Sequence, residues 1–401
     1  MGKGKDWSEA ESSKLSIGDA AGEIGRRAVC TPQSLGSSQL DDTPAIRAAI
    51  TSCGNGGTIV IPADTTYSLR TMLDFTGCNG CDFQLEGTLK SSTNTTYWAS
   101  QPGIIYLNRI TGATIRSVTG SGVLDGNGQA AYDEFAVDES LARPTAVYIV
   151  GGSQDIAISG LTVKNPPNVF FGQKGAVTNI NYSNLTMTAQ SKSTNLPRHT
   201  DGFSIGESRY TTIRDVYISN QDDCIGFKSG ANYVTVERAI CAGTNHGTVV
   251  GSLGKTNDDY VKNVYVKDLT IINCGKAAGI KVYPGGPSYG TSTVTNVTWD
   301  TVTVEGCDYG VQVESCYNRG DDECDANPSA ANLTDINFIN FAGITNAKRA
   351  PAVANLNCPA AGICDLMFSG WDVDTPNGSP EVLCENLDGD HGITCVPGAS
   401  G

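Results

Sequence analysis

The chain has 401 residues, including 47 glycines and 14 cysteines, and carries a formal net charge of −15 with a pI near 4.6. Its lysines and arginines form no cluster that could follow a phosphate backbone, so we expect no nucleic-acid partner. No run of 18 apolar residues is present, so we expect no membrane partner either. Long amphipathic helical patterns are nearly absent, which favours an all-β chain.

The even number of cysteines favours a secreted, extracellular, disulfide-bonded protein. Six N-glycosylation sequons agree with this: Asn94, Asn181, Asn184, Asn296, Asn332 and Asn377. Cysteines that lie close in the sequence suggest local bridges: Cys30 with Cys53, Cys224 with Cys241, Cys316 with Cys324, Cys358 with Cys364, and Cys384 with Cys395. Cys78 and Cys81 form a lone CxxC without a second pair at zinc spacing, and we expect no metal and no cofactor.

Residues 1–28 are polar and without pattern, and we expect a disordered tail or an engineered addition there. The first five residues lack the apolar region of a signal peptide, which is consistent with a mature or engineered start on a secreted protein. Thr43 and Pro44 precede apolar spacing over 45–50, which predicts a short N-terminal helix. We expect this capping helix to cover the open end of a stack of strands, which would otherwise aggregate.

A short strand phrase repeats along most of the chain. Two apolar–polar–apolar triplets flank a turn, as in 156–158 with 161–163 and 264–266 with 269–271. This repetition predicts an all-β, single-domain right-handed parallel β-helix, a solenoid, over residues 29–395. An antiparallel sandwich explains the repetition less well. Proline, cysteine and glycine become frequent from residue 350, so we expect 350–395 to form a disulfide-rich C-terminal cap and 396–401 a tail.

Five residues each open a short apolar run and mark the coils of the expected solenoid. They are Gly202, Cys224, Gly247, Gly279 and Gly310, which are 22, 23, 32 and 31 residues apart. Successive coils of a parallel solenoid stack at strand spacing, so residues in equivalent positions form ladders.

Carboxylates and a histidine directly precede the first three of these marks. Asp201, Asp223 and His246 would lie one above another on one face, with Asp222 beside them. Carboxylates this close repel one another and raise a pKa, a cost that a structural protein seldom accepts. Cleavage of a glycosidic bond needs one carboxyl group as acid and a second as nucleophile or as base for water. We therefore predict a glycosidase site here.

Four motifs of this region resemble, in the same order, those of glycoside hydrolase family 28, the polygalacturonases and their relatives. They are His199-Thr200-Asp201, Gln221-Asp222-Asp223, Asn245-His246-Gly247 and Gly279-Ile280-Lys281. The resemblance implies a right-handed parallel β-helix, metal-free inverting hydrolysis, and a plant cell-wall pectic polysaccharide as the partner. We expect a monomer.

The resemblance also implies roles for single residues. Asp222 corresponds to the general acid, Asp201 and Asp223 to the pair that activates water, and His246 to a supporting histidine.

Further residues of these motifs imply substrate binding. Lys281 corresponds to the residue that binds a galacturonate carboxylate, and Tyr309 to a tyrosine that lines the same cleft. Two positions depart from the family pattern, since His199 replaces an asparagine and Gly279 an arginine. Loss of that arginine removes a planar fork that a lysine cannot copy, and it widens the groove.

A widened groove favours endo-acting cleavage of a substituted galacturonan such as xylogalacturonan. An ordinary endo- or exo-polygalacturonase is the first alternative. A pectate-lyase-like β-helix would need calcium carboxylates and a basic residue among the aspartates, and only Lys281 is available. A non-catalytic pectin-binding solenoid fits the two altered positions but not the intact set of carboxylates.

Overall fold

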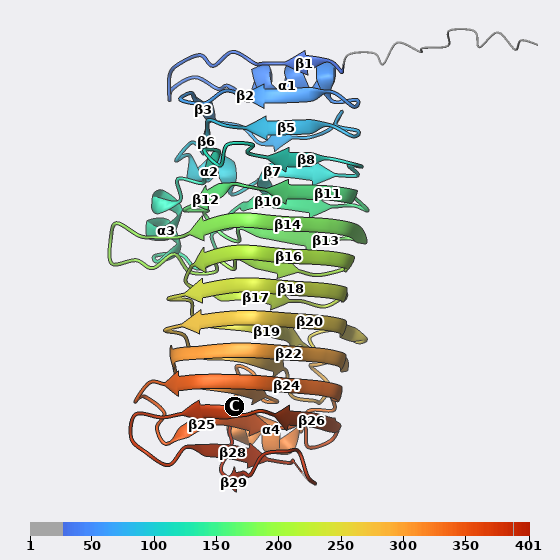
Figure 1. Cartoon of the computed structure of the whole chain (residues 1–401), viewed down its shortest axis with the longest axis vertical. Coiled ribbons are helices and arrows are strands. Elements are labelled where there is room, and N and C mark those ends of the chain that lie inside the picture. Colours follow the sequence, from blue (N-terminus) through green and yellow to red (C-terminus); the bar gives the residue numbers. More distant parts are fainter. Residues whose placement is uncertain (1–26, 388) are drawn as a thin grey trace, which may run out of the picture.

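The computed structural model describes residues 27–387 and 389–401. Within these residues the strands form two long sheets of 17 and 12 strands, and all of the pairings are parallel. Figure 1 shows them as one column of stacked coils that follows the sequence from end to end. This is the predicted right-handed parallel β-helix.

The first sheet, which we call the outer sheet, contains β1 (Val29–Cys30), β2 (Thr58–Ile61), β3 (Thr66–Leu69), β5 (Asp82–Leu85), β6 (Thr88–Ser91), β8 (Thr114–Arg116), β9 (Val123–Asp125), β11 (Gln154–Ser159), β12 (Thr162–Lys164), β14 (Val177–Thr188), β16 (Ser208–Ser219), β18 (Ala231–Ala242), β20 (Asp259–Ile272), β22 (Ser292–Cys307), β24 (Asn332–Thr345), β26 (Ile363–Ser369) and β27 (Asp372–Asp374).

The second sheet, which we call the site sheet, contains β4 (Leu73–Asp74), β7 (Gly103–Asn108), β10 (Thr145–Val150), β13 (Phe171–Lys174), β15 (Phe203–Ile205), β17 (Asp223–Phe227), β19 (His246–Leu253), β21 (Lys276–Val282), β23 (Tyr309–Glu314), β25 (Ala352–Asn357), β28 (Glu381–Glu385) and β29 (Val396–Pro397).

Apolar ladders fill the space between the two sheets. Trp299 pairs with Phe338 in register, and their rings stack with centroids 5.0 Å apart. Phe338 in turn stacks on Phe368 of the next coil at 4.8 Å. Each coil thus buries its apolar face only against its two neighbours, which fixes the register that positions the site.

Four short helices lie within the described residues: α1 (Thr43–Cys53), α2 (Thr95–Trp98), α3 (Gln129–Phe135) and α4 (Asp321–Ala326). The predicted N-terminal helix corresponds to α1, which lies beside β1 and β2 with Ile46 and Ile50 buried (Figure 1). That this helix protects the end of the stack stays a prediction. None of the described helices is long and apolar enough to cross a membrane.

Seven disulfides join all 14 cysteines. All five of the predicted pairs are present. Two further bridges are Cys78–Cys81, which accounts for the CxxC, and Cys274–Cys307, which joins consecutive coils 33 residues apart. The second was not predicted because its partners lie close in space but not in sequence.

The sequence predicts a tail at each end of the chain, and the structure describes the second of these fully but the first only in part. The tail expected over 1–28 lies outside the described residues up to residue 26. The expected tail over 396–401 is wrong, because Val396 and Pro397 form β29. Ser400 then returns to β25, where its backbone N–H and C=O bond to the side chain of Asn355 at 3.0 and 2.7 Å.

Candidate active site

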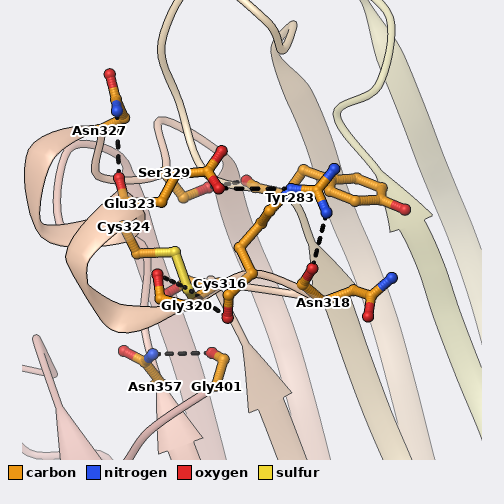
Figure 2. Close-up of a disulfide and its surroundings, with 12 residues drawn as sticks. Tyr283, Cys316, Asn318, Gly320, Glu323, Cys324, Asn327, Ser329, Asn357 and Gly401 are labelled. Atoms are coloured by element: carbon orange, nitrogen blue, oxygen red, sulfur yellow. Dashed lines mark hydrogen bonds and ion pairs between the residues drawn. A yellow bond between two sulfur atoms is a disulfide. The ribbon is translucent and has the colours of Figure 1, made fainter.

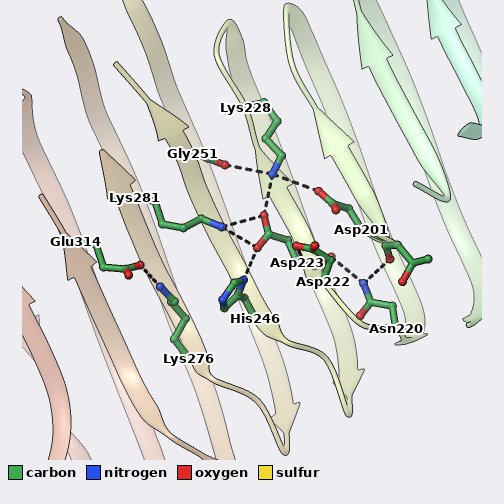
Figure 3. Close-up of polar contacts among 11 residues, drawn as sticks. Asp201, Asn220, Asp222, Asp223, Lys228, His246, Gly251, Lys276, Lys281 and Glu314 are labelled. Atoms are coloured by element: carbon green, nitrogen blue, oxygen red, sulfur yellow. Dashed lines mark hydrogen bonds and ion pairs between the residues drawn. The ribbon is translucent and has the colours of Figure 1, made fainter. Parts of the chain in front are cut away.

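The register of the site sheet brings the predicted cluster together. Asp223 pairs directly with His246, and Phe203 pairs with Ile225, which sets Asp201 level with Asp223. The predicted ladder is therefore present. Figure 3 shows Asp201, Asp222, Asp223 and His246 on neighbouring coils, with their side chains directed toward one another.

The expected position of Gly279 in this ladder is wrong by two residues. Thr248 pairs with Ala278, so Ala277 lies level with Gly247, while Gly279 pairs with Val249 and Gln312. The coil that ends in β21 is shorter than the glycine marks suggested. Lys276 consequently takes the place beside Tyr309 in the next pair of coils.

Asp223 is the electrostatic centre of the site. Its side chain is 1% exposed and accepts bonds at both oxygens: His246 Nδ1 lies 2.8 Å and Lys281 Nζ 3.0 Å from Oδ1, and Lys228 Nζ lies 2.7 Å from Oδ2 (Figure 3). Burial alone would raise the pKa of Asp223, but Lys228, Lys281 and His246 outweigh it and hold the pKa well below its usual range. Asp223 therefore stays ionised.

Asp222 has the opposite electrostatics. Burial, followed by the charges of Asp201 and Asp223, raises the pKa of Asp222 to about 7. Its Oδ1 accepts the backbone N–H of Asp223 at 2.8 Å, which fixes the carboxyl group without neutralising it. Two adjacent carboxyl groups in the sequence thus differ in protonation at mildly acid pH, which is the pattern of an acid beside a base.

Lys228 is the main site residue that sequence reasoning missed. Its Nζ lies 2.7 Å from Asp223 and 3.2 Å from Asp201, and it also donates to the carbonyl of Gly251 at 3.2 Å. The charges of both aspartates overcome burial and raise the pKa of Lys228. Lys228 follows directly after the end of β17, five residues after Asp223. Strand alternation places residues an odd number apart on opposite faces, so a ladder of alternate positions would not have found it.

His246 holds one ring nitrogen against Asp223. Burial lowers the pKa of His246, and its Nδ1 lies 2.8 Å from the ionised Asp223, to which it donates. Lys281 also faces Asp223, and its side chain is only 4% exposed. Burial opposes its charge, but Asp223 outweighs this and raises the pKa of Lys281. This lysine is thus paired with Asp223.

The space beside Gly279 is filled by a lysine. A Cβ at Gly279 would lie 2.8 Å from Cδ of Lys276 and 2.7 Å from the carbonyl of Gln312. Lys276 is buried and forms an ion pair with Glu314 of the next coil (Figure 3). An arginine at position 279 would therefore collide with Lys276, so the absence of that arginine is built into the packing of the groove floor.

The other two predicted binding residues lie at the edges of the cluster. Tyr309 is 8% exposed and lies beneath the guanidinium of Arg349, at 5.8 Å from the ring centroid. His199 is exposed, and its Nδ1 lies 3.1 Å from Arg143, while its ring meets Phe135 edge-on. Burial and then Arg143 lower the pKa of His199.

Asp222, Asp223 and His246 bring ligand atoms within 4.8 Å of one another, a spacing that a metal ion can use. Both oxygens of Asp223 already accept hydrogen bonds from lysines and from His246. A metal would have to displace these cations. That the site works without a metal or cofactor stays a prediction.

The family model "Glycosyl hydrolases family 28" matches residues 53–395, which include every residue of this cluster. The chain belongs to this family. It is a glycoside hydrolase, as the four motifs implied.

Within family 28, endo-xylogalacturonan hydrolase A of Aspergillus tubingensis is 54% identical over 378 residues, which cover 94% of this chain and 93% of that protein. The crystal structure of endo-xylogalacturonan hydrolase from the same organism superposes with a TM-score of 0.92 at 53% identity, over 93% of this chain and 100% of that one. A polygalacturonase from Erwinia carotovora is similar in fold alone, with a TM-score of 0.58 at 17% identity over 91% and 100% of the two chains.

Proposed function

We propose that this protein is a secreted, monomeric, inverting hydrolase that cleaves the galacturonan backbone of a substituted pectin, xylogalacturonan, at internal bonds. The observation that carries the proposal is the pairing of Asp222, whose pKa is raised to about 7, with the ionised Asp223. The identity of 54% to a protein named endo-xylogalacturonan hydrolase supports the choice of substrate. Seven disulfides support secretion.

In this proposal Asp222 is the general acid and protonates the oxygen of the leaving sugar. A water molecule then attacks the anomeric carbon from the opposite face, as an inverting glycosidase requires. Asp201 and Asp223 orient this water and remove its proton. Because both oxygens of Asp223 are already bonded, while the Asp201 side chain meets only Lys228 among the described residues, we assign the proton to Asp201.

The remaining residues position the reactants. His246 holds Asp223 from one side through Nδ1. We propose that Lys281 binds a galacturonate carboxylate beside Asp223 and that Tyr309 lines the same subsite. His199 contributes to the opposite wall with Arg143. Gly279 leaves that stretch of the groove without a side chain of its own.

The groove continues from Lys228 toward the N-terminal coils. A cavity of about 360 Å³ lies there, lined by Tyr148, Gln173, Glu207, Lys228 and Ser252, among others. Its lining includes Gly172 and Gly206, where neighbouring coils carry side chains. A polar, open groove of this kind suits a backbone that carries sugar branches.

A comparison of two polymers tests the proposal. The protein is incubated at about pH 4 with smooth polygalacturonic acid and with xylogalacturonan, and new reducing ends are counted. We expect faster cleavage of xylogalacturonan than of the smooth polymer. A rapid fall in viscosity would indicate cleavage at internal bonds. By NMR, the α-configured substrate should first give the β-anomer of the product, as inversion requires. Preference for the smooth polymer would instead identify an ordinary polygalacturonase, and retention of configuration would refute the roles of Asp201 and Asp223.

The pH dependence of activity follows from the raised pKa of Asp222. Asp222 must be protonated to act, so kcat/KM is expected to fall as pH rises through about 7, approaching tenfold per pH unit. Asp223, whose pKa is held well below its usual range, stays ionised and continues to orient the water well into the acid range. The measurement is kcat/KM on xylogalacturonan oligomers across the pH range. A rate that stays constant up to about pH 9 would contradict the assignment of the acid.

A further inference from the structure

Three tyrosines form a wall beside the carboxylates, on the two loops that follow β21 and β23. Tyr283 stacks on Tyr289 with centroids 5.3 Å apart and meets Tyr317 edge-on at 5.6 Å. We call Tyr283, Tyr289 and Tyr317 the tyrosine wall. Tyr317 lies 5.3 Å from Nζ of Lys281, so the wall begins where the catalytic cluster ends.

Cations surround this wall. Arg319 lies over Tyr289 at 5.5 Å and over Tyr283 at 6.0 Å, and Lys255 lies 5.1 Å from the centroid of Tyr283. Arg319 and Lys255 are both exposed, whereas Lys281 is buried. The guanidinium uses Nε toward the hydroxyl of Tyr289 and Nη1 toward the carbonyl of Asn318. A guanidinium carries five N–H donors, and these two bonds use only two of them. Donors on Nη1 and Nη2 are left over for a ligand.

A disulfide holds the loop that carries two of these residues. Cys316 bonds to Cys324 and flanks Tyr317 and Arg319 in the sequence. Figure 2 shows Tyr283 beside this disulfide and α4. Arg319 also lies 3.7 Å from Glu323 on α4, an exposed contact of small energy. The wall is therefore held in place before a ligand arrives, which lowers the entropy cost of binding.

The lysines of the groove floor are already paired with carboxylates of the protein itself. Lys228 and Lys281 are engaged by Asp201 and Asp223, and Lys276 is engaged by Glu314. A galacturonan carries a carboxylate on each backbone sugar. Arg319 and Lys255, as exposed cations next to aromatic faces, are suited to a sugar ring that carries a carboxylate.

We propose that the tyrosine wall, with Arg319 and Lys255, binds one galacturonate of the backbone on the C-terminal side of the cleavage site. The carboxylate meets Arg319 and Lys255, and the sugar ring lies against Tyr317. This proposal rests on the proposed galacturonan substrate. In this proposal Arg319, on a loop of the tyrosine wall, supplies the guanidinium that is absent at position 279.

The chain offers a matched control. Tyr210 and Tyr233 also stack, at 5.0 Å, and Arg209 lies over them at 5.3 and 5.6 Å. This second cluster has the same chemistry but lies on β16 and β18 of the outer sheet, away from the carboxylates. Arg209→Gln therefore removes an equivalent arginine without touching the groove.

The test is steady-state hydrolysis of smooth and of xylose-substituted galacturonan oligomers by Arg319→Gln, Arg209→Gln and the unaltered protein. We expect Arg319→Gln to raise KM for both substrates by roughly three- to tenfold with kcat nearly unchanged. Tyr317→Ala should also raise KM, while Tyr317→Phe, which keeps the ring, should not. The difference between Arg319→Gln and the unaltered protein should shrink as salt is raised, because an exposed charge pair is screened.

Two outcomes would overturn the proposal. If Arg319→Gln behaves like Arg209→Gln, the wall binds no part of the substrate. If KM rises only for the xylose-substituted oligomers, Arg319 contacts the branch and not the backbone carboxylate. Should the unaltered protein cleave neither polymer, the proposed function fails. Calorimetric binding of the same oligomers to the unaltered protein and to Arg319→Gln then shows, without any cleavage, whether the tyrosine wall binds them.

Discussion

Asp222→Asn is expected to abolish turnover while the fold remains intact. Asparagine has the same shape and still offers an oxygen to the backbone N–H of Asp223, which Asp222 accepts at 2.8 Å. It cannot deliver a proton to the leaving oxygen. We expect kcat to fall by about a hundred- to ten-thousandfold, the usual contribution of a general acid. The measurement is release of reducing ends, with the far-ultraviolet spectrum as the check on folding.

Stability gives this variant a second, independent readout. In the folded protein the pKa of Asp222 is raised from 3.8 to about 7. The stability associated with the protonated group is therefore fully present below the unfolded pKa and is lost as pH rises through about 7. At about pH 8 the free energy of unfolding of the variant should exceed that of the unaltered protein by about 1–3 kcal/mol, and at about pH 3 the two should agree.

Asp215→Asn is the matched control, because Asp215 is an aspartate of the outer sheet that pairs with Arg238 at 2.7 Å. It should keep full activity. Residual activity of Asp222→Asn within about tenfold of the unaltered protein would show that another group donates the proton.

The sequence predicts the coil architecture and the carboxylate ladder for the same reason. Asp201, Asp223 and His246 each precede an apolar run, and a solenoid repeats its register from coil to coil. Gly279 was misplaced because a coil may gain or lose residues in its loops without changing its strands. The spacing of glycines alone could not show which residue of β21 lies level with Gly247.

Contacts that depend on loop paths and on side-chain direction could not be predicted from the sequence. Lys228 follows the end of β17, and its long side chain reaches Asp201 and Asp223 from there, which strand alternation does not predict. Lys276 bonds to Glu314 of the adjacent coil, 38 residues later in the sequence. The tyrosine wall is assembled from two loops whose paths have no repeating pattern. Local disulfides were predictable because both partners lie on one loop, whereas Cys274–Cys307 joins separate coils.

Lys228→Met is expected to weaken both catalysis and the fold. The methionine keeps most of the side-chain volume but removes the cation that contacts Asp223 at 2.7 Å and Asp201 at 3.2 Å. Removing one partner leaves buried charge uncompensated, which typically costs about 3–5 kcal/mol. Because 30% of the Lys228 side chain is exposed, water offsets part of this, and we expect about 2–3 kcal/mol in the free energy of unfolding.

The effect of Lys228→Met on activity has a definite sign. Without the lysine, Asp223 loses one of the cations that hold its pKa down, so the pKa of Asp223 rises. The acid limb of the kcat/KM profile should then move to higher pH, while the alkaline limb set by Asp222 moves up as well, since Lys228 no longer offsets the neighbouring anions. Activity at about pH 4 should fall by roughly ten- to a hundredfold and recover in part near pH 6.

Lys164→Met provides the control, because Lys164 lies 3.7 Å from Asp125 in a pair whose lysine is 41% exposed. It should change neither the pH profile nor, by more than about 1 kcal/mol, the stability. A loss of stability in Lys228→Met without a shift of the acid limb would mean that Lys228 only holds the coils together. A shift of the acid limb would instead identify Lys228 as a residue that keeps Asp223 ionised while Asp222 stays protonated, which is the charge separation that the proposed reaction requires.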